Sequence, residues 1–308
     1  MSPRAPASDH APDPHVVTQL LREQAPHLAH LPIRPSGTSG SSNWVFRVGD
    51  DLAVRMPRTA DYVPDLLNEV RWLSRVAPGL SVAVPEVHVV GRSNEVFPRT
   101  WLVVCWVPGE TPGDLDGAQQ DLLARTLGHA LRDLHACDTG NAPAGESHWG
   151  YRCGEPVTGT IDGWAEQAAT ALADVFDPTG ILEAWRRLRD VPAASQPACL
   201  VHTDLSSENL LVDTDGRLAG LIDFGAMGVG DRSIDFLYAW SLFDEPARTT
   251  LFTTAGTDDA TWARARAWAF VGPGLLTLAN YRNSMPGRTD RLTAMVDNVA
   301  AEVGVQLR

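Results

Sequence analysis

The first third of the chain contains short stretches in which apolar and polar positions alternate. Four segments have the composition and length of strands, and they are residues 43–48, 52–56, 81–90 and 100–107, the last of which is apolar almost throughout. Gly49-Asp50-Asp51 lies between the first two and favours a tight turn. Residues 15–30 and 64–76 have helical spacing instead. This region is therefore predicted to form a small sheet with one helix packed on it and a short helix before it.

The pattern changes after Pro108-Gly109-Glu110-Thr111-Pro112-Gly113, a segment whose composition breaks regular structure. Apolar residues then recur mostly with a helical period, and the predicted helices are residues 118–136, 164–176, 182–191, 261–281 and 291–303. Two short apolar segments, residues 200–212 and 218–222, flank the turn sequence Asp213-Thr214-Asp215-Gly216 and predict a hairpin.

This change in pattern divides the chain into three predicted parts. Residues 1–14 are rich in Pro, Ala and Asp without an apolar core, which predicts a disordered tail rather than a signal peptide. Residues 15–107 are predicted to form an N-terminal lobe, and residues 108–308 a larger, mainly helical C-terminal lobe. The expected class is α+β, with an antiparallel sheet in the small lobe.

Composition narrows the possible partners. The 308 residues include 25 Lys and Arg against 38 Asp and Glu, a net charge of −13 that disfavours nucleic acid and anionic membranes. The charge mildly favours cationic ligands, although solubility alone accounts for most of it. Four cysteines without a CxxC pair indicate reduced thiols. The longest apolar run, residues 101–107, is too short to cross a bilayer, so we expect a cytoplasmic protein.

One constellation of polar residues points to chemistry. Asp204 and Asn209 lie five residues apart, and the predicted hairpin brings the chain back to Asp223. Phosphoryl transfer requires a carboxylate that orients the acceptor hydroxyl and takes its proton, together with oxygen ligands that hold Mg²⁺ against the phosphates. Each residue alone could serve a turn, since Asp and Asn favour turns. All three at this spacing predict a kinase site.

These residues belong to a longer pattern that resembles the aminoglycoside phosphotransferase family, which is related to the protein kinases. The pattern consists of His202-Thr203-Asp204, Asn209, Ile222-Asp223-Phe224-Gly225, Gly230-Asp231 and Asp235. The resemblance implies a bilobal protein-kinase-like fold, Asp204 as the catalytic base, and Asn209 and Asp223 as Mg²⁺ ligands. Asp231 and Asp235 are expected to brace the larger lobe.

The resemblance also implies a nucleotide site in the small lobe. Arg55, where the family usually has Lys, would bind the phosphates and pair with Glu69 on the following helix. The flexible loop over the phosphates would include Gly37, Ser39 and Ser41. The hinge would contact the purine through backbone groups near Cys105, Trp106 and Val107. A surface ion pair and a plain connector are the simpler interpretations of the first two features.

The expected activity is Mg²⁺-dependent transfer of the γ-phosphate of ATP or GTP to a small-molecule hydroxyl, with an aminoglycoside or related antibiotic as acceptor, and hence antibiotic resistance. A macrolide 2'-phosphotransferase and a metabolic kinase of choline, homoserine or a sugar are the alternatives, and a kinase-shaped protein that binds without catalysis is the rival from another class. We expect a monomer. Candidate walls of the acceptor site are Asp231, Trp240, Asp244, Glu245, Trp268, Asn280 and Tyr281.

Overall fold

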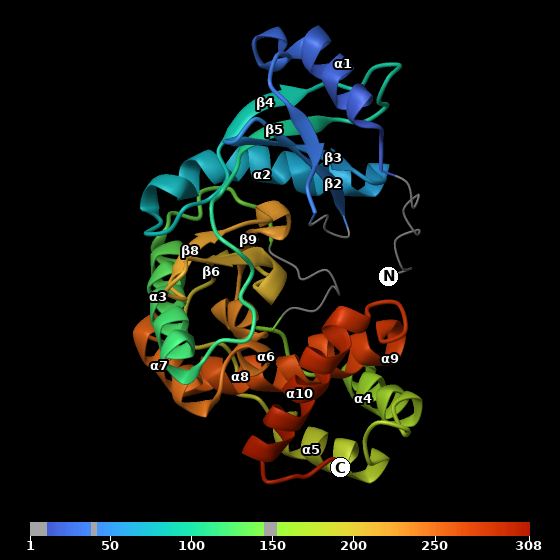
Figure 1. The fold of residues 1–308 in the computed structure, drawn as a ribbon. Helices are drawn as coiled ribbons and strands as arrows, with labels where there is room; N and C mark the ends of the chain where they lie inside the picture. The colour runs from blue at the N-terminus through green and yellow to red at the C-terminus, as the bar shows by residue number, and fades with distance from the viewer. Residues whose placement is uncertain (1–10, 38–41, 145–152) are drawn as a thin grey trace. The chain divides into compact units, whose positions relative to one another are not determined.

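The computed structural model describes residues 11–37, 42–144 and 153–308 (Figure 1). Its internal contacts divide the chain into two compact units. The first comprises the chain up to Gly109 together with the returning segment Ala219–Ala226, and the second comprises Glu110–Leu218 and Met227–Arg308. The chain therefore enters the first unit twice, and the second visit brings in the Asp223 region.

An antiparallel sheet forms the centre of the first unit. In spatial order its strands within the described residues are β1 (Ile33–Pro35), β2 (Asn43–Val48), β3 (Leu52–Pro57), β5 (Trp101–Cys105) and β4 (Val87–Gly91). Arg55 of β3 faces Val45 of β2 on one side and Leu102 of β5 on the other. A residue on this central strand is held by ladder hydrogen bonds on both sides, which makes it a rigid support for a functional side chain.

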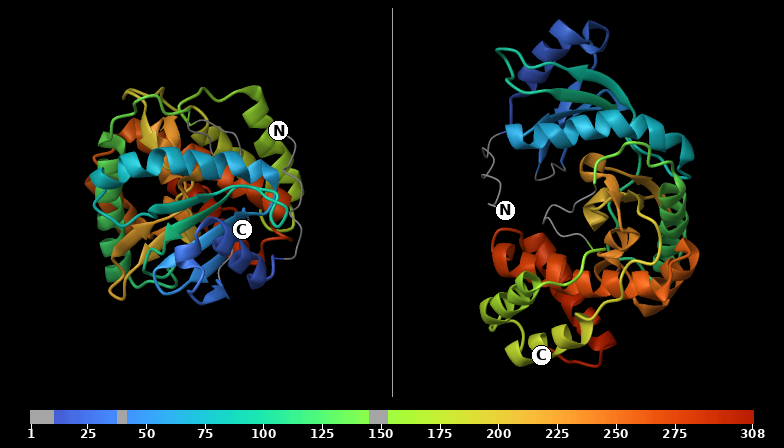
Figure 2. Two further views of the ribbon diagram at one scale, coloured as in Figure 1. Left: turned by 90° about the horizontal axis from the view of Figure 1, so that it is seen from above. Right: turned by 180° about the vertical axis from the view of Figure 1, so that it is seen from behind.

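The two faces of the sheet are covered by two different helices (Figures 1 and 2). Helix α1 (Pro14–Gln24) buries Leu20 and Leu21 against one face, in a cluster that includes Phe46 and Met56. Helix α2 (Val63–Val76) packs on the other face. There Leu66 of the helix forms a second buried cluster with Ala53, Leu102 and Val104 of the strands. The period-2 alternation seen in the sequence thus corresponds to two separate apolar cores.

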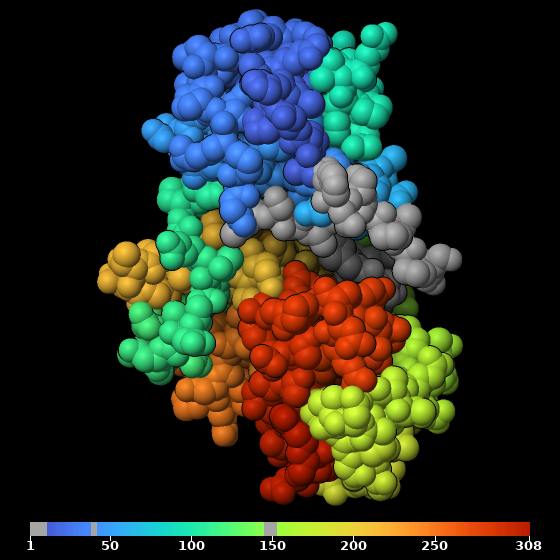
Figure 3. All heavy atoms as spheres, turned by 45° about the vertical axis from the view of Figure 1, so that its right-hand side comes forward, coloured from blue at the N-terminus to red at the C-terminus, as the bar shows by residue number. Residues whose placement is uncertain are grey.

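Helices make up most of the second unit. They are α3 (Gly117–Ala136), α4 (Gly159–Ala171), α5 (Pro178–Leu188), α6 (Ala239–Leu242), α7 (Glu245–Ala255), α8 (Asp259–Ala269), α9 (Thr277–Tyr281) and α10 (Pro286–Glu302). Helices α4 and α5, yellow-green in Figure 3, cover one side of the C-terminal helices. In the described residues no helix combines the length and the apolar character needed to cross a membrane. The mixed α+β class is confirmed.

Short strands and turns between the helices carry the predicted motif. Strand β6 (Cys199–Val201) pairs antiparallel with β9 (Gly228–Gly230). Strands β7 (Leu210–Val212) and β8 (Leu218–Leu221) flank the turn expected from the sequence, in which the Asp213 carboxylate accepts hydrogen bonds from two backbone N–H groups. Short 3₁₀ helices connect these strands: Ser207–Asn209 precedes β7, Phe224–Ala226 follows β8, and Arg232–Phe236 follows β9.

The strand predicted at residues 81–90 begins only at Val87. Upstream of it, the Ala83 N–H donates to Ala219 and the Ala83 carbonyl accepts from Leu221. These backbone groups are therefore occupied by the returning segment of the same unit. Pro85 has no N–H to donate to a sheet ladder, which also stops the strand from extending in this direction.

The long helix predicted at residues 261–281 is interrupted. Between α8 and α9 the chain forms a π-helical segment, Phe270–Leu276, that contains Pro273. Proline removes one N–H donor and crowds the preceding turn, so the regular i→i−4 ladder cannot continue through it. Helix α7 was not predicted, because polar and threonine residues dilute its apolar stripe.

Two glycines in helices test how closely α3 and α7 pack. A Cβ at Gly128 of α3 would lie 2.9 Å from Thr254 Cβ and 3.1 Å from the Ala255 backbone nitrogen, both on α7. We predict that Gly128→Ala lowers the free energy of unfolding by about 1–3 kcal/mol, the usual effect of overpacking. The matched variant Gly163→Ala in α4, where a Cβ meets no atom within 4 Å, should instead stabilise by about 0.5–1 kcal/mol. Urea unfolding measures both, and equal effects would contradict the close helix contact.

Candidate active site

Arg55 lies between two carboxylates within the first unit. Its Nη1 donates to Glu69 Oε2 at 2.5 Å, and its Nη2 donates to Asp223 Oδ1 at 3.1 Å. Glu69 comes from α2 and is fully buried, whereas Asp223 comes from the returning segment and is about one third exposed. A guanidinium has two separate donor nitrogens in a planar fork, so one arginine can hold both carboxylates at once.

Burial and charge act against each other in this cluster. Burial would lower the pKa of Arg55, but the charges of Glu69 and Asp223 outweigh it and raise that pKa above its usual value. Burial raises the pKa of Glu69, and the positive charge of Arg55 opposes this effect. Arg55 therefore keeps its charge, which is the property that a phosphate-binding side chain needs.

The returning segment is fixed on α2 by more than this ion pair. Asn68 Nδ2 donates to the Gly225 carbonyl at 2.9 Å. A Cβ at Gly225 would lie 2.9 Å from Asp65 Cβ, so only glycine allows the backbone to approach the helix this closely. Asp223 itself has φ 66°, in the left-handed region that Asp tolerates better than most residues. The Ile222-Asp223-Phe224-Gly225 motif is thus a tight turn that places the Asp223 carboxylate beside Arg55.

Asp204 and Asn209 meet in the second unit. The Asn209 amide nitrogen donates to the Asp204 carbonyl at 2.8 Å and to Asp204 Oδ2 at 3.1 Å. Asn209 is buried, and it closes the loop through a 3₁₀ turn at Ser207–Asn209. The spacing of five residues therefore brings these two side chains together as predicted. The hydrogen bonds restrict the orientation of the Asp204 carboxylate before any substrate binds.

The loop before Asp204 is held by the buried carboxylate of Asp235. Asp235 accepts hydrogen bonds from the backbone N–H groups of His202 (3.2 Å) and Thr203 (2.8 Å), and its Oδ2 lies 2.9 Å from His135 Nε2. Thr203 has φ 77°, a conformation that favours glycine and costs a β-branched residue about 1–2 kcal/mol. Glycine is the residue that the family resemblance suggests at this position, and here the Asp235 contacts help to maintain the turn with threonine. His202 is fully buried beside it.

A small, open pocket lies next to this loop, within the second unit. Its lining includes Ser206, Glu208, Tyr238, Arg288 and Arg291. Burial raises the pKa of Tyr238 well above its usual value, and the charge of Asp204 and a hydrogen bond to it add to this effect. Tyr238 thus connects the pocket to Asp204. Local sequence patterns do not predict this contact, because more than thirty residues separate Tyr238 from Asp204.

Two arginines of α10 hold the single carboxylate of the pocket lining. Arg288 Nε donates to Glu208 Oε1 at 3.1 Å, and Arg291 donates to the same oxygen. Burial would raise the pKa of Glu208, but the two guanidinium charges outweigh it and lower that pKa below its usual value. Glu208 is therefore a carboxylate at neutral pH, and positive charge exceeds negative charge in the pocket lining.

Several residues expected to form acceptor walls have other roles. Trp240 and Trp268 are buried in the core, at 0% and 3% exposure. Asp231 forms an ion pair with the buried Arg264, and Asp244 caps α7. The expectation was wrong for Trp240 and Trp268, because the core accounts for both side chains. For Asp231 and Asp244 a place in the acceptor wall stays a prediction.

The remaining predicted nucleotide contacts lie in the first unit. Gly37 is exposed, whereas Ser39 and Ser41 lie outside the described residues. The backbone N–H of Cys105 donates to Glu86, and that of Trp106 donates to Asp51. The Val107 side chain is buried, and it fills the space beside Gly220 that a Cβ would occupy.

Comparisons with known proteins show which family and fold the chain shares. The model of the phosphotransferase enzyme family matches residues 35–268. An aminoglycoside 3'-phosphotransferase of Escherichia coli is 27% identical over 217 residues, which are 67% of this chain and 71% of that protein. The structure of wild-type aminoglycoside 2'-phosphotransferase-IIIa in its GDP complex superposes with a TM-score of 0.65 at 17% identity, over 95% of this chain and 100% of that chain. Macrolide 2'-phosphotransferase MphH from Brachybacterium faecium gives a TM-score of 0.61 at 18% identity, over 93% and 97%.

The fold and the motif residues define a kinase-like enzyme that transfers phosphate to hydroxyl groups of small molecules. The chain belongs to the phosphotransferase enzyme family, whose model matches most of its length.

The Arg55 cluster should be important for stability as well as for function. We predict that Arg55→Ala lowers the free energy of unfolding by about 3–5 kcal/mol, because it leaves the buried Glu69 carboxylate without its partner. Arg125→Ala is the matched control, since it removes an exposed arginine that pairs with Asp121 one helical turn away, and should cost less than about 0.5 kcal/mol. Denaturant unfolding distinguishes the two, and similar losses would show that the Arg55 pairs contribute no more than a surface contact.

Proposed function

We propose that the protein transfers the γ-phosphate of ATP or GTP, with Mg²⁺, to a hydroxyl group of an antibiotic-type small molecule. Asp204 is the proposed catalytic base, and Asn209 and Asp223 are the proposed metal ligands. The observation that supports this most directly is the double hydrogen bond from Asn209 to Asp204. It holds a carboxylate in one orientation, which is what positioning an acceptor hydroxyl requires.

The side chains proposed for Mg²⁺ have suitable chemistry. Because the Asn209 amide nitrogen donates to Asp204, the amide oxygen is the atom that it can offer to a cation. Asp223 uses Oδ1 for Arg55, and its partly exposed carboxylate has a second oxygen. Both are hard oxygen ligands, which Mg²⁺ prefers alongside its waters. When bound, the ion would neutralise the negative charge on the phosphates.

Arg55 is the proposed phosphate-binding cation. It is charged, 12% exposed and held on a central strand, and its contact with Glu69 fixes the guanidinium from the buried side. For the purine we propose the backbone of Val107, because the preceding N–H groups at Cys105 and Trp106 donate within the protein. Structures of the related aminoglycoside phosphotransferases contain GDP or ADP, which supports a nucleotide as donor. Since ATP and GTP are cytoplasmic, we propose that the protein acts there.

The acceptor hydroxyl is proposed to enter the pocket lined by Ser206, Glu208, Tyr238 and Arg288, which adjoins Asp204. The first candidate acceptor is an aminoglycoside, because an aminoglycoside 3'-phosphotransferase is among the relatives. The second is a macrolide, because a macrolide 2'-phosphotransferase is among the structural neighbours.

The charge of the pocket favours the second candidate. Two guanidinium groups and one carboxylate belong to the lining, and Asp204 beside it adds a second carboxylate that also acts on Arg288. A ligand with several ammonium groups could place one of them near Asp204, but its others would meet the like charges of Arg288 and Arg291. A neutral or weakly cationic acceptor avoids this repulsion. A panel of aminoglycosides, macrolides and primary metabolites with a hydroxyl group tests the proposed function. Each compound is assayed with ATP for release of ADP and with GTP for release of GDP. No turnover with any of them would remove antibiotics from the proposal.

Substitution of the proposed base should separate catalysis from binding. We predict that Asp204→Asn lowers kcat by about 10²–10⁴-fold, the usual contribution of a general base, and leaves nucleotide affinity within a few-fold. Stopped assays give kcat, and calorimetry gives the affinity. Asp215→Asn, which changes an exposed carboxylate of the nearby turn, is the control and should retain full turnover. Wild-type kcat in Asp204→Asn would exclude Asp204 as the base.

Reversing one charge of the pocket should change its preference between acceptors. We predict that Arg291→Glu raises kcat/KM for an aminoglycoside relative to a macrolide by about tenfold at low salt, because removing one repulsion is worth roughly 1.4 kcal/mol. The effect should shrink as ionic strength rises, since Arg291 is partly exposed. Arg186→Glu on α5 makes the same change in net charge at an exposed residue outside the pocket lining, and it serves as the control. An unchanged ratio in Arg291→Glu would show that acceptors bind elsewhere.

A further inference from the structure

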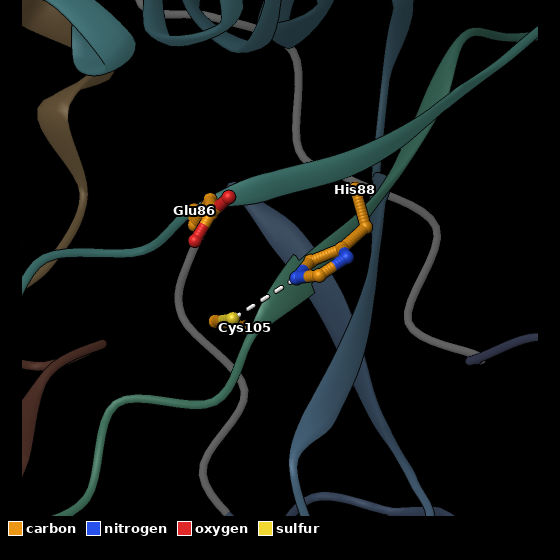
Figure 4. A group of neighbouring side chains, drawn as sticks. All are labelled: Glu86, His88 and Cys105. Atoms are coloured by element: carbon orange, nitrogen blue, oxygen red, sulfur yellow. Dashed lines mark hydrogen bonds between the residues drawn. The ribbon is translucent and has the colours of Figure 1, made fainter.

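Three side chains with metal-binding atoms converge in the first unit, away from the Arg55 cluster. Glu86 precedes β4, His88 lies on β4, and Cys105 ends β5 (Figure 4). One ligand atom from each lies within 4.8 Å of the other two, and His88 Nε2 is 3.0 Å from Cys105 Sγ. Glu86 and His88 are exposed, and Cys105 is partly exposed, so an ion from solvent can reach them.

A β-bulge explains why these side chains face one another. Val87 pairs with Val104, and Val89 pairs with the neighbouring Val103. His88, between the two valines of β4, is therefore the extra residue of the bulge. A bulge of this kind re-aims the side chain of the inserted residue. Glu86 lies opposite Cys105, and the backbone N–H of Cys105 donates to the Glu86 carbonyl at 2.8 Å. The bulge thus adds an imidazole to a carboxylate and a thiol that the strand register already places together.

The three donors match the preferences of zinc. Zn²⁺ binds thiolate, imidazole and carboxylate at about 2.0–2.3 Å, and four tetrahedral ligands at such lengths lie roughly 3.5 Å apart. The spacing in the cluster is compatible with this geometry after small side-chain adjustments. The negative charges of Glu86 and Asp51 also act on the Cys105 thiol, which makes the site attractive for a cation. Mg²⁺, which prefers oxygen ligands, does not suit a thiol and an imidazole.

We propose that Glu86, His88 and Cys105 form a zinc site with water as the fourth ligand. On binding, the S–H bond of Cys105 breaks, its proton passes to solvent, and a zinc–sulfur bond forms, with no change of oxidation state. The ion links the start of β4, an edge strand, to the end of β5, and so fixes the strand that leads into residues 106–109. This site is separate from the proposed Mg²⁺ ligands and does not depend on the proposed function.

Titration of the metal-free, untagged full chain with Zn²⁺ tests the site. We expect one ion per chain by calorimetry, and a thiolate-to-metal charge-transfer band when Co²⁺ replaces Zn²⁺. Zinc should also protect Cys105 from alkylation, which peptide mass spectrometry detects, and should leave the labelling of Cys137, the other partly exposed thiol, unchanged.

Variants identify the ligands. Cys105→Ser and His88→Ala should each weaken zinc affinity by at least about tenfold. Replacing a residue that only hydrogen-bonds to a metal ligand typically costs about 10–100-fold, and replacing a ligand itself should cost no less. Cys137→Ser and His129→Ala remove a partly exposed thiol and an exposed imidazole from the second unit, and they should bind zinc as the wild type does. His88 is exposed, so its variant is expected to fold, which thermal unfolding without metal verifies.

The proposal is overturned if the wild type binds no zinc, or if binding survives both ligand substitutions unchanged. In either case the bulge at His88 would serve only to shield the edge strand β4 from pairing with another chain.

Discussion

The first unit depends on one buried cation. Arg55, Glu69 and Asp223 come from segments separated by as many as 168 residues. The charge of the buried Glu69 carboxylate is offset by Arg55, and the charge of Arg55 is supported by both carboxylates. The guanidinium fork fixes the order of contacts, with Glu69 on the buried side and Asp223 on the more exposed side. This contact explains why Ala219–Ala226 folds with the sheet although the chain around it belongs to the second unit.

The second unit uses a buried charge in a similar way. Asp235 is 3% exposed, and it satisfies two backbone N–H groups and faces His135. Losing it would remove the acceptor of two backbone N–H groups and loosen the strained turn at Thr203. In both units, then, a buried carboxylate holds part of the proposed site: Glu69 holds the Arg55 side chain, and Asp235 holds the backbone before Asp204. The two carboxylates proposed for catalysis and metal binding, Asp204 and Asp223, are the more exposed members of each group.

Contacts between near neighbours in sequence were predictable, and distant ones were not. The five-residue spacing indicated that Asp204 and Asn209 meet, and the helical period placed α2 within one residue. No local pattern could indicate that Arg288 and Arg291 hold Glu208, because 80 and 83 residues separate them. The π-helical segment was missed for a different reason, since the apolar period runs across it and only the local signal Gly272-Pro273-Gly274 marks the break.

The pocket shows why net charge is a weak guide to a ligand. A total of −13 suggested a mild preference for cationic acceptors, yet the lining beside Asp204 has two guanidinium groups and one carboxylate. At physiological ionic strength exposed charges are screened beyond about 8 Å, so the many acidic residues elsewhere on the surface act only weakly on a bound molecule. Groups within a few ångströms are screened much less and determine which charge a ligand can carry. For an acceptor bound in the proposed pocket, Arg288, Arg291, Glu208 and the neighbouring Asp204 are therefore a better guide to its charge than the composition is.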